Sequence, residues 1–156
     1  MELEEAKEIS LELMNTSKAA VLTTIDSEGF PITRAMFNLK NEEQFPEFSE
    51  FFNKQENRFT IYISTNTSSS KVDHIKENSK ISVYYFDPEE FKGVMFGGEV
   101  EIVNDMDLKS KIWLDWWDRY YPEGLKDPDY TLLKMNPKVA RVYYKLQQAR
   151  FEPGED

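Results

Sequence analysis

The stretch AAVLTTIDSEGFPITRAMF, residues 19–37, contains two β-prone runs separated by turn-forming residues. The first run covers residues 19–24, the turn residues are Asp26 to Gly29, and the second run covers residues 31–37. Pro31 stands at the first position of the second run, where the missing N–H of proline does little harm to a strand. The pattern therefore predicts a β-hairpin, the simplest unit of an antiparallel sheet.

The rest of the chain continues this pattern of short strands. Hydrophobic spacing predicts strands over residues 59–64, 80–86, 93–103, 131–135 and 139–144. Helices are expected near the N-terminus, after Pro46, over residues 70–77 and from Asp105 to Tyr120. The Gly97-Gly98 pair inside a strand is typical of a barrel corner or of a backbone that approaches a ligand. With no βαβ rhythm, linker or repeat, residues 1–156 are interpreted as a single, mainly β domain, a small antiparallel barrel with flanking helices.

The composition excludes several classes of function. The 156 residues include 29 acidic and 19 basic side chains, a formal net charge of −10. Such a surface repels nucleic acids and anionic membranes, although a locally basic pocket remains compatible with one small anionic ligand. The absence of Cys and the single His argue against disulfides, thiolate chemistry and a metal site. Without a signal-peptide core or an apolar run of roughly 20 residues, a cytoplasmic location is expected.

The hydroxyl-rich loop STNTSSSK, Ser64 to Lys71, has the clearest chemical character. It joins an expected strand to an expected helix, so hydroxyls, free helix N–H groups and the Lys71 charge could converge on a phosphate. An ordinary helix cap after a serine-rich turn, with Ser70 and Asp73 as the capping pair, is the commoner origin of such a pattern. The residues alone leave both interpretations open.

Two further features have a structural and a functional interpretation. Arg34 lies within the second β-prone run, where a buried guanidinium needs either a ligand anion or an acidic neighbour at the sheet edge. Large aromatic side chains at helical spacing either form a core or cover a planar ligand or a subunit interface. These aromatic residues are Trp113, Trp116, Trp117, Tyr120 and Tyr121. The lone His74, between Asp73 and Lys76, is expected to be solvated.

Taken together, these segments resemble a known superfamily. The resemblance runs through the Gly29-x-Pro31-x-x-Arg34-Ala-Met end of the hairpin, YISTNTSSSKV (62–72), NSKISVYYF (78–86), GGEVEIVND (97–105), Trp113 and YPEGLKDP (121–128). In order and spacing they are similar to the pyridoxamine 5′-phosphate oxidase-like, FMN-binding split-barrel superfamily, and within it to the general stress protein branch.

The resemblance implies a homodimer of six-stranded antiparallel split barrels that binds FMN between its subunits. It implies flavin-dependent oxidoreductase chemistry on a small molecule, with the substrate, the electron donor and any catalytic residue unknown. The cofactor-binding positions carried over are Arg34, Ala35, Met36, Ser64, Thr65, Ser69, Ser70 and Lys71. Trp113 and Trp117 are expected either to reach the flavin or to seal the subunit interface.

Three departures from the family pattern limit what is carried over. Ser70 stands where oxidases of the family often have Arg, so the phosphate contact is expected to be weaker or to be completed by hydroxyls. Residues 141–150 lack the oxidase's basic C-terminal segment, which argues against vitamin B6 oxidation. The acidic, Phe-rich insert over residues 40–57 is longer than this connection usually is, and no role is assigned to it. Alternatives on the same fold are a non-catalytic flavin-binding or stress-response module, or a protein that binds a deazaflavin coenzyme or haem.

Overall fold

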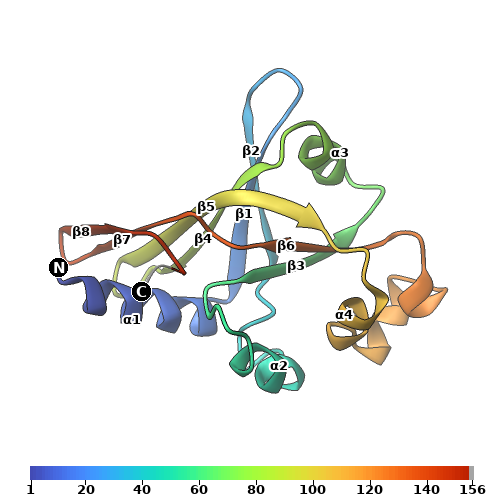
Figure 1. Ribbon diagram of the computed structural model, residues 1–156, viewed down its shortest axis with the longest axis horizontal. Helices are drawn as coiled ribbons and strands as arrows, with labels where there is room; N and C mark the ends of the chain where they lie inside the picture. The colour runs from blue at the N-terminus through green and yellow to red at the C-terminus, as the bar shows by residue number, and fades with distance from the viewer. Residues whose placement is uncertain (155–156) are drawn as a thin grey trace.

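The computed structural model describes residues 1–154 and shows a curled antiparallel sheet with helices around it (Figure 1). The strands are β1 (Ala19–Ile25), β2 (Pro31–Phe37), β3 (Ile61–Asn66), β4 (Lys80–Asp87), β5 (Lys92–Ile102), β6 (Tyr130–Met135), β7 (Val139–Tyr144) and β8 (Gln147–Phe151). The α-helices are α1 (Leu3–Thr16), α2 (Ser49–Asn53), α3 (Ser70–Glu77) and α4 (Met106–Lys111), and the 3-10 helices are η1 (Pro46–Phe48), η2 (Asp115–Arg119) and η3 (Gly124–Lys126). No helix within residues 1–154 is long and apolar enough to cross a membrane.

Six strands form the main path of the sheet, in the order β2-β1-β4-β5-β6-β3. All of their pairings are antiparallel, and the hairpin predicted over residues 19–37 pairs Ala19 with Phe37 and Ile25 with Pro31. The expectation of a mainly β split barrel with flanking helices is therefore confirmed. The described sheet has eight strands rather than six, because β7 pairs with β5 and carries β8 as a further hairpin. The polar sequence QQARF of β8 gave no strand signal.

The sheet bends at β5, which pairs with different strands along its length. Its first part pairs with β7 as far as Gly97, and its last residues, Val100 to Ile102, pair with β6. At Gly98 a Cβ atom would lie only 3.3 Å from the carbonyl oxygen of Asn136, in the connection between β6 and β7. The glycine pair thus marks a corner where two backbones approach each other, which is one of the two interpretations of the sequence.

The helix expected from Asp105 to Tyr120 is instead two short helices, α4 and η2. Leu114, just before η2, has extended backbone angles (φ −121°, ψ 137°). Ile112 and Trp117 are both buried in one aromatic cluster. Five residues apart on a continuous helix, their side chains would point about 140° away from each other. The break lets both enter the same core.

The insert over residues 40–57 builds part of this second core. Phe45, Phe48 and Phe52 are buried, and the ring centroids of Phe48 and Trp117 lie 5.9 Å apart. Phe52 packs in the same way against Tyr62 of β3, at 6.1 Å. The first core, between α1 and the sheet, is separate and mostly aliphatic. The insert therefore packs against Trp117 and against Tyr62 of β3 and helps to hold both rings in place.

Lys40, the first residue of the insert, donates a hydrogen bond from Nζ to the carbonyl oxygen of Arg58 (2.6 Å) and lies 5.4 Å from the ring centroid of Phe52. Within residues 1–154 it has no ion pair with a carboxylate. Burial, and secondly the charge of Arg58, lowers the pKa of Lys40 to about 7.

The lowered pKa of Lys40 predicts a pH-dependent stability. In the unfolded chain this lysine titrates near pH 10.4, so between about pH 7 and 10 the unfolded state binds more protons and the free energy of unfolding rises with pH. Below pH 7 the cost of burying the charge is fully present. We expect urea unfolding to show wild type gaining on the order of 1–3 kcal/mol over Lys40→Met between pH 7 and pH 9.5. The exposed Lys54 of the same insert, replaced by Met, is the control. Parallel pH profiles of wild type and Lys40→Met would contradict the prediction.

Candidate functional site

A cavity of about 620 Å³ lies between β2 and β3, the two ends of the sheet order. In the described part of the chain, β2 pairs only with β1 and β3 only with β6, so the cavity occupies the split that the sheet leaves open. Its lining from the two strands is Arg34, Ala35, Met36, Phe37, Ser64, Thr65 and Asn66. The other lining residues are Lys18, Ala19, Gln44, Lys71, Trp117, Tyr120 and Tyr121.

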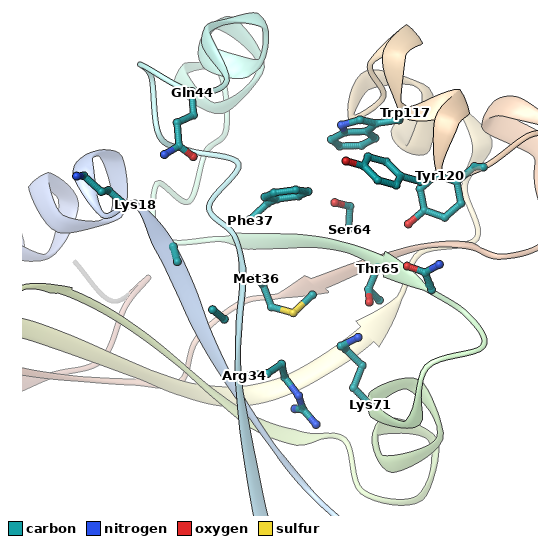
Figure 2. A pocket seen from close by; sticks show the side chains of 14 residues that line it. Lys18, Arg34, Met36, Phe37, Gln44, Ser64, Thr65, Lys71, Trp117 and Tyr120 are labelled. Atoms are coloured by element: carbon teal, nitrogen blue, oxygen red, sulfur yellow. The ribbon is translucent and has the colours of Figure 1, made fainter.

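The cavity has two chemically different ends (Figure 2). Arg34 of β2 and Lys71 of α3 lie near each other at one end. The rings of Phe37, Trp117 and Tyr120 form the opposite end. Met36, Ser64 and Thr65 line the space between them. The site can therefore receive a ligand that is anionic at one end and planar and apolar at the other.

Strand register places Arg34 at the cationic end. Arg34 is paired with Leu22, and Met36 with Ala20, both of which are buried, so the two side chains share the interior face of the hairpin. Nη1 of Arg34 donates a hydrogen bond to Oγ1 of Thr24 (2.7 Å). Burial lowers the pKa of Arg34, but a guanidinium remains protonated near neutral pH.

Lys71, in the first turn of α3, supplies the second positive charge. Burial, and secondly the charge of Arg34, lowers the pKa of Lys71. Among residues 1–154 neither cation forms an ion pair with a carboxylate. Two uncompensated, partly buried charges that repel each other are stabilised by an anion bound between them.

Seven of the ten residues predicted to bind a cofactor line the cavity: Arg34, Ala35, Met36, Ser64, Thr65, Lys71 and Trp117. Ser69, Ser70 and Trp113 are not among its lining residues. Ser70 is exposed at the start of α3, and Trp113 packs against Trp117, Tyr121 and Tyr130. A role for these three in binding stays a prediction.

The serine-rich loop is anchored differently from either interpretation of its sequence. Ser69, rather than Ser70, is the N-cap residue of α3, and its Oγ donates to the carbonyl oxygen of Asn66 (2.8 Å) instead of capping a helix N–H. Asp129 accepts hydrogen bonds from the Ser68 N–H (2.8 Å) and from Nδ2 of Asn66 (2.9 Å). These bonds, led by that of the Ser68 N–H, lower the pKa of Asp129. These loop hydrogen bonds thus stabilise the fold, and the residues of this segment that line the cavity are Ser64, Thr65, Asn66 and Lys71.

The sequence did not identify several residues of the site. Gln44 comes from the insert, and nothing in the sequence marked it as a site residue. Tyr120 and Tyr121 were recognised among the aromatic residues at helical spacing but were not among the predicted cofactor-binding residues. The expectation of a solvated His74 is wrong: the residue is half-buried, and its Nδ1 lies 3.0 Å from Oγ1 of Thr24. Helix α3 packs on β1, and this contact turns the histidine toward the strand.

Comparisons with known proteins agree with this architecture. The sequence matches the family described as pyridoxamine 5′-phosphate oxidase like over residues 4–151. It is 26% identical to general stress protein 26 of Bacillus subtilis over 145 residues, 91% of each chain.

Solved structures show the same fold. A protein from Clostridium acetobutylicum, described as related to general stress protein 26 and of the pyridoxinephosphate oxidase family, is 31% identical, with a TM-score of 0.75 over 97% of this chain and 96% of that one. A haem-binding protein from Mycobacterium smegmatis shares the fold alone, at 12% identity and a TM-score of 0.63 over 91% of this chain and 57% of the other. The family match over nearly the whole chain, together with the curled antiparallel sheet, shows that this chain belongs to the pyridoxamine 5′-phosphate oxidase-like family.

Proposed function

We propose that the cavity between β2 and β3 binds FMN and that the protein is an FMN-dependent oxidoreductase acting on a small molecule. The observation that carries the proposal is the two-ended cavity, with a pair of uncompensated cations at one end and aromatic rings at the other. A phosphate monoester carries close to two negative charges near neutral pH, which matches the charges of Arg34 and Lys71. The volume of about 620 Å³ lies within the range typical of cofactor pockets.

Different residues of the cavity would bind the phosphate and the ring of the flavin. Arg34 and Lys71 would neutralise the phosphate, and the hydroxyl groups of Ser64 and Thr65 offer further hydrogen bonds along the cavity. The rings at the opposite end, with Met36, would hold the flavin ring and exclude water from it. When bound, the flavin supplies the redox chemistry, and the protein supplies binding, orientation and charge. The proposal includes a cytoplasmic location.

A specific observation favours FMN over haem. His74, the one histidine of the sequence, does not line the cavity, and its Nδ1 is engaged with Thr24. A histidine axial ligand is therefore not offered to a haem at this site. The absorption spectrum of the protein reconstituted with each cofactor tests this choice directly, and a stoichiometric haem complex would contradict it.

The catalytic part of the proposal has its own experiment. We expect the FMN-loaded protein to oxidise NADH or NADPH in sustained turnover with a suitable acceptor. Binding of FMN without turnover across a broad panel of donors and acceptors would show a flavin-binding module rather than an enzyme.

The cationic end predicts a phosphate-specific loss of affinity in Lys71→Ala. Removal of a charge-assisted contact worth roughly 1.5–3 kcal/mol weakens FMN binding about ten- to hundredfold. Riboflavin lacks the phosphate and should bind both proteins alike. Titration of flavin fluorescence quenching measures both affinities.

Lys76→Ala is the matched control, because Lys76 is exposed on the same helix and does not line the cavity. Equal FMN affinities for Lys71→Ala and Lys76→Ala would show that the phosphate does not bind at this end.

We also propose a homodimer. Strand β2 has a free edge and exposes Phe37 on the face opposite Arg34, and β4 exposes the stacked rings of Tyr84 and Phe86, 5.5 Å apart. Exposed apolar surface next to an unpaired edge strand is typical of an interface between subunits.

The mass of the protein in solution tests the proposed dimer. Light scattering at micromolar concentration should give about twice the 18.4 kDa of the chain, and Phe86→Glu should shift the mass toward the monomer. A monomeric wild type that still binds FMN would disprove the dimer while leaving the flavin site intact.

A further inference from the structure

We infer that Thr24 and His74 are positioning residues that hold the guanidinium of Arg34 in place for a phosphate. The inference deepens the proposed function and rests on it. Its basis is a partly buried chain of two hydrogen bonds that leads from the cationic end of the cavity through β1 to α3.

The chemistry of Arg34 fixes the direction of the first bond, and the tautomer of His74 sets the direction of the second. Arg34 can only donate, so Oγ1 of Thr24 accepts from Nη1 across 2.7 Å. The single hydroxyl proton of Thr24 is then free to be donated to Nδ1 of His74, 3.0 Å away. Thr24 donates in this bond when the ring proton of His74 is on Nε2, which leaves Nδ1 as the acceptor. Each member of the chain orients the next.

Burial makes the chain rigid. Thr24 has no exposed surface, so its hydroxyl has no water to turn to and depends on these two partners. As a β-branched residue on a strand paired on both sides, by β2 and by β4, Thr24 has little freedom about χ1. Because Nη1 is bound to Thr24, the other N–H groups of Arg34 remain free to donate hydrogen bonds to a ligand in the cavity.

The chain also fixes the spacing of the two cations. Lys71 and His74 are three residues apart on α3 and therefore on one face of the helix, which packs on β1 through its buried residues Val72 and Ile75. Helix α3 thus presents one cation to the cavity and, through Thr24, restrains the other. The repulsion between Arg34 and Lys71 would otherwise favour an arginine that swings away from the site.

Matched substitutions separate positioning from structural support. Thr24→Val keeps the shape of the side chain and removes the hydroxyl, whereas Thr24→Ser keeps the hydroxyl. We expect Thr24→Val to weaken FMN binding roughly tenfold with riboflavin affinity changed less than about twofold, and Thr24→Ser to bind FMN like wild type. Likewise His74→Asn, whose Oδ1 can accept the Thr24 proton, should retain more FMN affinity than His74→Leu. A merely structural role would lower the affinity for both flavins together.

Nitrogen-15 NMR offers a second readout, because His74 is the single histidine of the sequence and its ring signals need no assignment. Saturation with inorganic phosphate should move these signals in wild type and much less in Thr24→Val. Equal shifts in both proteins would show an effect of charge through space and overturn the inference.

The binding results also keep the two proposals apart. Failure of wild type to bind either flavin would overturn the proposed function and this inference with it. A wild type that prefers FMN over riboflavin, together with Thr24→Val and His74→Leu variants that keep the same preference, would overturn the inference alone.

Discussion

The edges of β2 and β3 face each other across a cavity instead of pairing, and the candidate site depends on this open seam between the two strands. A sheet that bends at Gly97-Gly98 brings its two ends together, yet among residues 1–154 no ladder closes them. Unpaired strand edges present N–H and C=O groups that need partners. A seam of this kind is stable when a ligand, a second subunit or water satisfies those groups, and it places side chains from distant parts of the sequence on either side of one space.

The seam also shows how a chain with a formal net charge of −10 can contain a locally positive site. At long range the acidic surface repels polyanions, and salt screens this field within about 10 Å. Inside the cavity Arg34 and Lys71 are close and partly desolvated, so their field dominates locally. Under the proposed function, the same balance would favour one small phosphate compound over a nucleic acid, whose remaining phosphates would meet the acidic surface.

The sequence predicted the regular parts of the molecule well because local signals define them. Alternating strands, the turn at Asp26 to Gly29 and the helix over residues 70–77 depend on neighbours in sequence, and all are present. Arg34 and Lys71 were found from two different motifs, but their proximity depends on the packing of α3 on β1. The break at Leu114, the role of the insert's phenylalanines and the contact of His74 with Thr24 are tertiary effects. No spacing rule reveals them, because each is decided by what lies opposite in the folded chain.

The two ends of the cavity are built from different kinds of structure, and this difference bears on specificity. The cations stand on β2 and α3, where register and helix packing fix them. Trp117 and Tyr120 come from η2 and its C-terminal end, and Gln44 from the insert, which are short or irregular segments held by aromatic packing. Regular elements keep a geometry that many sequences can specify, whereas loops and short helices change shape with a few substitutions. The cationic end is therefore the part of the site that the fold itself supplies, and in the proposed function the insert and η2 would decide which ring and which substrate are accepted.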